Sequence, residues 1–198
     1  MEETLLELIL REEDELSGVE AISLVETPAT EEDWIFLSEH KVELAVADTE
    51  KRILMGAALV PNKKIKRAPK EEGGKPFFIF FSENTVRQIS QKFLKSGKQN
   101  NTTLAHQIPL NNVSIVESWI IEDDVHDKSR KFGLTAPVGT WMLSVKVEDD
   151  TVWNEWVKEG RIKGFSIEGK FADALHIQAE SEDKAVKTLE LILNILTT

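Results

Sequence analysis

The sequence predicts an α+β fold, with a largely antiparallel sheet or barrel and flanking helices. About eight short segments show the apolar runs or the apolar–polar alternation typical of strands, and roughly three or four show helical spacing. Strands and helices do not alternate regularly, which disfavours a doubly wound parallel sheet. With 198 residues, of which 41% are hydrophobic, the chain suits one domain with appendages.

Four segments have the spacing or the capping residues of a helix. Residues 1–16 are predicted to form a short acidic helix, because Leu5, Leu6, Ile9 and Leu10 fall on one side. The other three are a helix capped by Ser82 and closed by Gly97, a short helix capped by Asp149 or Asp150 and closed by Gly160, and a final amphipathic helix from Ser181.

The predicted strands are residues 21–25, 34–37, 42–46, 51–60, 76–81, 102–108, 113–121, 141–147 and 164–171. A turn at Pro61-Asn62 ends one of them. The residues Pro109, Asn111 and Asn112 separate segments 102–108 and 113–121, and that spacing predicts a hairpin between the two segments. We divide the chain into an acidic extension (1–17), a β-rich domain (18–180) and a C-terminal amphipathic helix (181–198).

Composition excludes several classes of protein. The 35 acidic and 24 basic residues give a net charge of −11, which argues against a duplex-binding module. Because there is no cysteine, disulfide scaffolds, thiol catalysis and thiolate metal sites are excluded. The N-terminal segment lacks the features of a signal peptide, and no apolar run reaches the roughly 20 residues needed to span a bilayer. We therefore expect a soluble, intracellular protein that binds neither nucleic acid nor membrane.

The segment GFSIEGKF carries the most informative polar residues. On a strand, Phe165, Ile167 and Phe171 would face the core, whereas Ser166, Glu168 and Lys170 would project from the opposite, exposed face. A serine between glycines that allow another chain to approach closely is a candidate nucleophile. The spacing G-x-S-x-x-G differs from the α/β-hydrolase elbow, and an exposed strand serine is more often structural.

His106, near the end of a predicted strand, is the natural partner of Ser166. A neutral imidazole can accept the serine proton and return it to a leaving amine. A histidine at a hairpin end with its polar tip in water is the commoner case. From the residues alone it is open whether His106 and Ser166 meet.

Three other groups of residues have weaker functional interpretations. The acidic loop with Glu122, Asp123, Asp124, His126 and Asp127 has oxygen ligands for a divalent cation, but a solvated loop is the simpler explanation, and we predict no metal site. An acidic partner could contact the basic cluster, but a solvated loop is again the simpler explanation. The cluster consists of Lys63, Lys64, Lys66, Arg67 and Lys70. Trp34, Trp119 and Trp141 could anchor a partner, but each falls in an alternating apolar run typical of a core.

Several segments in order resemble the XkdF-type prohead serine proteases of tailed bacteriophages. They are GVEAISLVETPATEEDWIFL, KRILMGAALVPNKKIKR, FFSENTVRQISQKFL, NNTTLAHQIPLNNVSIVESWIIED and GTWMLSVKVEDDTVWNEWVKEGRIKGFSIEGKF, from about residue 18 to about residue 173. The resemblance implies a small β-barrel surrounded by helices, similar to herpesvirus assemblins. It therefore makes residues 18–180 a protease-like β-barrel domain.

The resemblance also implies an activity and its residues. Ser166 in GFSIEG would be the nucleophile and His106 in LAHQ the general base of a serine endopeptidase that works through an acyl-enzyme and needs no cofactor. Glu168 is our choice for the third member, since it shares a strand face with Ser166. Glu20, Glu117 and His176 are the alternatives.

The family works in the host cytoplasm inside the immature capsid, where it cuts scaffolding protein and the N-terminal segment of the capsid protein. Those two proteins would be the substrates, and the resemblance leaves homo-oligomerisation open. Two other functions remain as alternatives: a catalytically silent structural or internal capsid component that keeps the protease fold, and an acidic β-rich binding module.

Overall fold

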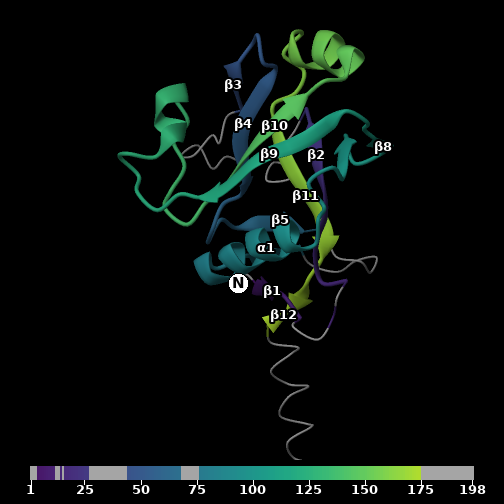
Figure 1. Ribbon diagram of the computed structural model, residues 1–198. Helices are drawn as coiled ribbons and strands as arrows, with labels where there is room; N and C mark the ends of the chain where they lie inside the picture. The colour runs from purple at the N-terminus through teal and green to yellow at the C-terminus, as the bar shows by residue number, and fades with distance from the viewer. Residues whose placement is uncertain (1–3, 12–13, 15, 27–43, 68–75, 175–198) are drawn as a thin grey trace, which may run out of the picture.

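The computed structural model describes residues 4–11, 14, 16–26, 44–67 and 76–174 (Figure 1). The predicted strand at 34–37, the final helix from Ser181, and the candidate residues Lys70 and His176 lie outside these residues. Within the described ranges, no helix has both the length and the apolar character required to cross a membrane.

The described strands form three four-stranded sheets. Their bounds are β1 (Leu5–Ile9), β2 (Gly18–Val25), β3 (Ala45–Asp48), β4 (Ile53–Leu59), β5 (Ile65–Arg67), β6 (Phe77–Phe80), β7 (Thr102–Leu104), β8 (Ile108–Pro109), β9 (Val113–Ile120), β10 (Trp141–Val147), β11 (Gly164–Lys170) and β12 (Ala172–Asp173). The strand orders are β12-β1-β6-β5, β3-β4-β10-β9 and β11-β2-β7-β8. Only the β1–β6 and β2–β7 pairs are parallel, so the predicted mostly antiparallel α+β architecture is confirmed.

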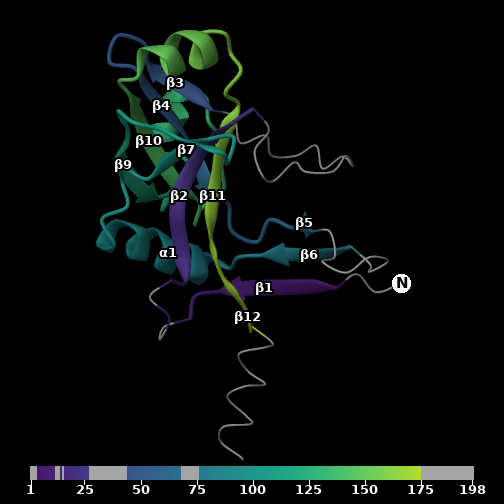
Figure 2. The same ribbon diagram turned by 90° about the vertical axis from the view of Figure 1, so that its right-hand side faces the viewer.

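The closed β-barrel expected from the resemblance is wrong for the part of the chain that the structure describes. Its strands form three open sheets, and β4 packs against β11 without joining its ladder. The alternation of apolar and polar residues determines which face of a strand is apolar. Closure of a barrel depends instead on which edge strands pair with each other, and the local sequence does not encode that pairing. Figure 2 shows β2 and β11 running side by side, with β1, β5 and β6 extending to the right beside their lower part.

The predicted N-terminal helix is also wrong, because residues 5–9 form β1. This strand pairs in parallel with β6 (Leu6 opposite Ile79) and antiparallel with β12 (Ile9 opposite Ala172). A short apolar segment fits a helix or a strand equally well, and here pairing with distant strands decides the outcome. Leu6, Leu8 and Leu10 pack against the main core, which places this segment within the fold.

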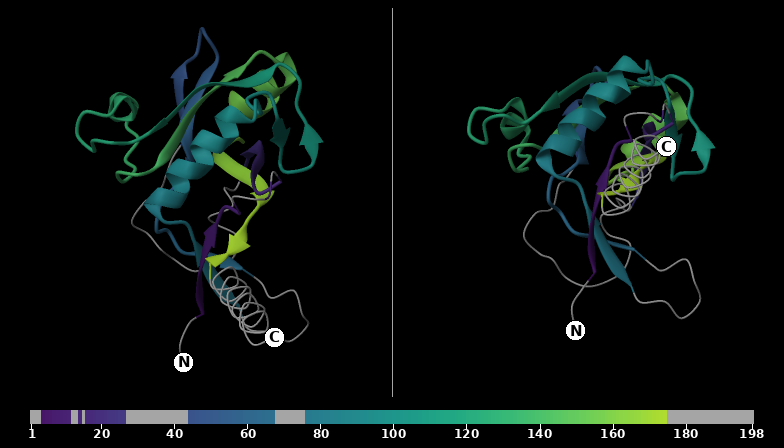
Figure 3. Two further views of the ribbon diagram at one scale, coloured as in Figure 1. Left: turned by 60° about the horizontal axis from the view of Figure 1, so that its bottom comes forward. Right: turned by 90° about the horizontal axis from the view of Figure 1, so that it is seen from below.

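Helix α1 (Glu83–Lys95) confirms its predicted caps. The Ser82 Oγ accepts a hydrogen bond from the Thr85 N–H at 3.4 Å, and Gly97 ends the helix with a φ of 68°. The helix packs against β2, β9 and β10 (Figure 3), and its Phe93 ring meets the Trp141 ring edge-to-face at 5.4 Å. The core residue expected at Trp141 is therefore confirmed.

Two shorter helices lie beyond β9. The 3-10 helix η1 (Lys128–Phe132) falls in the loop where no helix was predicted. The predicted short helix after β10 is present as the π-helix η2 (Val152–Val157), and the Asp149 carboxylate accepts the Val152 N–H at 2.9 Å. The predicted hairpin between 102–108 and 113–121 is wrong, since β7 pairs with β8 and β9 pairs with β10.

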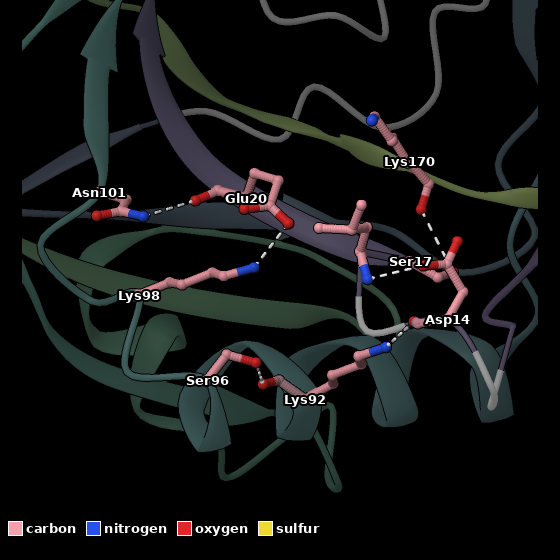
Figure 4. A network of polar contacts seen from close by, with 9 residues as sticks. Asp14, Ser17, Glu20, Lys92, Ser96, Lys98, Asn101 and Lys170 are labelled. Atoms are coloured by element: carbon pink, nitrogen blue, oxygen red, sulfur yellow. Dashed lines mark hydrogen bonds and ion pairs between the residues drawn. The ribbon is translucent and has the colours of Figure 1, made fainter.

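A polar network fixes the N-terminal end of β2 (Figure 4). The Lys92 Nζ of α1 donates to the Asp14 carbonyl oxygen at 2.9 Å, and the Ser17 Oγ donates to the Lys170 carbonyl oxygen at 3.5 Å. These contacts connect the segment before β2 to both α1 and the end of β11. They therefore help to fix the position of β2, the strand between β11 and β7.

Candidate active site

The GFSIEGK segment forms β11, antiparallel to β2, with Ser166 opposite Ser23. Phe165 faces the core as predicted, with its ring 3.3 Å from the position that a Cβ on Gly56 would take. Ser166 and Glu168 are on the other face, but the expectation of an exposed serine is wrong, since Ser166 is 2% exposed. The reason is that both faces of the sheet are covered at this point, since the first half of β11 and nearly all of β2 are buried.

The Ser166 hydroxyl is unusual in its surroundings. Among the described residues, its Oγ has no hydrogen-bond partner although it is buried. Such a group normally has a partner, because an unsatisfied buried hydroxyl costs about 1–3 kcal/mol. The buried Thr140 Oγ1 also lacks a partner among the described residues, so the missing hydrogen bond does not by itself assign a function to Ser166.

Gly169 confirms the expectation of close approach. A Cβ at this position would lie 2.2 Å from the Gly18 carbonyl oxygen. The register between β11 and β2 shifts between Glu168 and Gly169, where Glu20 is the extra residue on β2. The second glycine of GFSIEG therefore serves the packing of β11 on β2.

His106 lies in the tight turn that joins β7 to β8. The Gln107 N–H donates to the Leu104 carbonyl oxygen at 3.1 Å, and the central residues Ala105 and His106 have φ values of 51° and 60°. These are the features of a type I′ turn, which usually has Asn or Gly at such positions. Holding two other residues there costs of order 1–3 kcal/mol each, so the turn presents the imidazole at an energetic cost.

The structure brings His106 and Glu168 together. The His106 Nδ1 lies 3.2 Å from the Glu168 Oε1, and the two side chains are 40% and 30% exposed. The Thr103 hydroxyl also donates to the Glu168 Oε1, and the His106 backbone N–H donates to the Ser23 Oγ at 2.9 Å. A carboxylate at Nδ1 leaves Nε2 free to act as a base. No hydrogen bond joins the His106 ring to the Ser166 Oγ, which has no partner among the described residues.

The alternative third members have other partners. Glu20 is paired with Lys98 at 2.7 Å. Glu117 is paired with Lys128 at 2.8 Å and accepts a hydrogen bond from Ser144, and the ammonium and then the hydroxyl lower the pKa of Glu117. Of these carboxylates, Glu168 is the one in contact with the His106 ring.

Three residues beside this pair were missed by the sequence analysis. They are Ala21 and Ser23 on β2 and Thr103 on β7, and the register pairs Ser23 with both Ser166 and Thr103 while Ala21 is opposite Glu168. Nothing in the local sequence distinguishes them, because their role depends on a parallel pairing between segments about 80 residues apart.

The remaining candidates are engaged in local contacts. The Asp123 carboxylate contacts the His126 ring at 2.9 Å, and that hydrogen bond, helped by two backbone N–H groups, lowers the pKa of Asp123 to about 2. Asp127 caps η1 and accepts the Trp119 indole N–H at 3.0 Å. Among the described residues, no group of three or more acidic or histidine side chains could hold a metal ion.

A cavity of about 530 Å³ adjoins the serine. Its wall includes Ser166 together with apolar side chains from five strands and from the segments that follow β6 and β11, among them Leu59, Ile79, Phe81 and Phe171. Arg67 and Lys170 also line it. A cavity of this size and composition is suited to an apolar side chain or a small ligand.

A serine, a histidine and a glutamate are the side-chain types that serine hydrolases use. Here Ser166 and Glu168 lie on β11, and His106 lies in the turn after β7, with β2 between the two strands. The family described as "Putative phage serine protease XkdF" matches residues 41–175. This is more than half of the chain, so the protein belongs to that family, as the sequence analysis expected. The match begins after β2, although β2 is the central neighbour of β11 in the site. Searches of curated proteins and of solved structures found no match.

Proposed function

We propose that this protein is a serine endopeptidase in which Ser166 is the nucleophile, His106 the general base and Glu168 the group that orients the imidazole. The observation that carries the proposal is the 3.2 Å contact between the His106 Nδ1 and the Glu168 carboxylate. Glu168 lies two residues after Ser166 on β11, and the buried Ser166 hydroxyl has no hydrogen-bond partner among the described residues. Family membership supports the same activity.

The proposed mechanism requires the His106 ring to reach the Ser166 hydroxyl, which is buried and has no hydrogen-bond partner among the described residues. Glu168 accepts the Nδ1–H, which leaves Nε2 as the base that removes the Ser166 proton. The serine Oγ then attacks the peptide carbonyl, and the protonated imidazole returns its proton to the leaving amine. Water, deprotonated by the same imidazole, hydrolyses the resulting acyl-enzyme and frees the serine. No step requires a cofactor or a metal.

We propose further that the substrates are the scaffolding protein and the N-terminal segment of the major capsid protein, cut inside the procapsid in the host cytoplasm. Membership in a phage protease family supports this setting. The alternative is a structural capsid component with a silent site, and the burial of Ser166 at 2% exposure favours it, since a substrate must reach the hydroxyl.

Intact-mass analysis of the full chain, co-expressed with its scaffolding and capsid proteins, tests the proposal. Wild type should produce specific new termini, and Ser166→Ala should produce none. Ser90→Ala is the matched control, because Ser90 is also a buried serine but bonds to a helix carbonyl, and it should cleave like wild type. His106→Asn should abolish cleavage while tolerating the left-handed turn. Uncut proteins in assembled shells from wild type would support the structural alternative.

A further inference from the structure

We infer that Thr103 and Ser23 are positioning residues that hold the Glu168–His106 pair in its productive arrangement. The inference rests on the proposed function for its consequence in catalysis. Its structural part stands on the register of three adjacent strands, which places one hydroxyl from each strand in a row: Thr103 of β7, Ser23 of β2 and Ser166 of β11.

Glu168 must reach across a whole strand to meet its partners. β11 and β7 both pair with β2, so their backbones are separated by about two strand spacings of 4.8 Å each. The residue of β2 opposite Glu168 is Ala21, which is small and buried. The methyl group of Ala21 leaves the glutamate side chain room to extend over β2 towards Thr103 and the turn beyond it.

Thr103 fixes the end of that side chain. A carboxylate can only accept, so the Thr103 hydroxyl is the donor to Glu168 Oε1, the same oxygen that contacts the His106 Nδ1. Two donors on one oxygen define both its position and its direction. A hydrogen bond to a charged group is among the stronger ones, which makes Thr103 an effective restraint.

Ser23 fixes the other partner through the backbone. Its Oγ accepts the His106 N–H at 2.9 Å, and the Leu24 carbonyl oxygen accepts the neighbouring Ala105 N–H at 3.0 Å. Both residues of the left-handed turn are thereby tied to β2. Since the turn is strained, these bonds keep the imidazole from relaxing away from Glu168.

The test uses Thr103→Val, which keeps the shape and removes the hydroxyl, with Thr103→Ser as the conservative rescue. The matched control is Thr102→Val, since the neighbouring Thr102 Oγ1 donates to the Val113 carbonyl oxygen away from the site. In processing assays Thr103→Val should lower kcat about 10- to 100-fold with little change in KM. Thr103→Ser should recover most of the loss, and Thr102→Val should stay near wild type.

A second measurement does not depend on activity. In the Ser166→Ala chain, the proton on the His106 Nδ1 should give a downfield NMR resonance that Thr103→Val shifts or broadens and Thr102→Val leaves in place. Unchanged kcat in Thr103→Val, equal losses in Thr103→Val and Thr102→Val, or an unaffected resonance would overturn the inference. If wild type cleaves nothing while the resonance responds as expected, the proposed function fails and the positioning role stands.

Discussion

Replacing Gly169 by alanine should destabilise the protein strongly, because β11 and β2 approach too closely there for any side chain. The new Cβ would lie 2.2 Å from the Gly18 carbonyl oxygen and 3.0 Å from the Val19 Cα, whereas ordinary contacts begin at 3.4 Å. Both of these neighbours are backbone atoms, so the strands themselves have to separate by about 1 Å.

The magnitude follows from what that separation breaks. Overpacking of a well-packed site costs about 1–3 kcal/mol. Moving the strand end also weakens the pairing of Gly169 with Val19 and of Lys170 with Gly18, and each lost backbone hydrogen bond costs about 1 kcal/mol. We therefore expect a loss of about 3–5 kcal/mol, a large part of the 5–15 kcal/mol typical of a domain.

Urea unfolding followed by circular dichroism measures this loss, with Gly97→Ala as the matched control. Gly97 has a φ of 68° and no atom within 4 Å of a new Cβ, so its substitution reports only the cost of the left-handed backbone, about 1–2 kcal/mol. If Gly169→Ala costs no more free energy of unfolding than Gly97→Ala, the close approach of the two strands is not what the glycine provides.

Two further substitutions test local features. Ala105→Gly should raise the free energy of unfolding by roughly 0.5–1 kcal/mol. The reason is that glycine removes the strain of the left-handed φ of 51°, and this gain exceeds the cost of the more flexible unfolded chain. The control Asn112→Gly, at a φ of 56°, should change the free energy little in the same urea titration. His126→Ala should raise the pKa of Asp123 from about 2 towards 3.8, measured by NMR titration of its carboxyl carbon. Since the folded pKa is depressed, the contribution of Asp123 to stability is complete above about pH 4 and is lost as the pH falls towards 2. A pKa unchanged by the substitution would mean that the backbone donors alone hold it down.

The elements that were predicted correctly are those whose signal is local. The strand at 141–147 and the capping serine of α1 each depend on one segment, and both are present as expected, although β10 is buried on both faces. The errors concern β1, the hairpin after Leu104 and the closure of the barrel. The errors at β1 and at the barrel arise from pairing with distant strands, as when β1 pairs with β6 and β12. The hairpin error arises from a tight turn that pairs β7 with β8.

The site divides in the same way. Ser166, His106 and Glu168 were selected from their motifs, and the contact between His106 and Glu168 supports that choice without testing the role of either residue. The burial of Ser166 was not predicted, because the sequence of one strand does not reveal what covers both faces of its sheet. Ser23 and Thr103 belong to ordinary strand sequences, and only the three-strand register distinguishes them.

The position of β2 also bears on what the folding unit is. The family match spans residues 41–175, yet β2 lies before it and pairs with both β11 and β7. Among the described strands, β2 is the one that aligns Thr103 and His106 with Glu168. Removing it would also take the buried side chains of Ile22 and Leu24 out of the core. A chain restricted to the matched region would therefore contain every proposed catalytic side chain and lack the strand that brings them together.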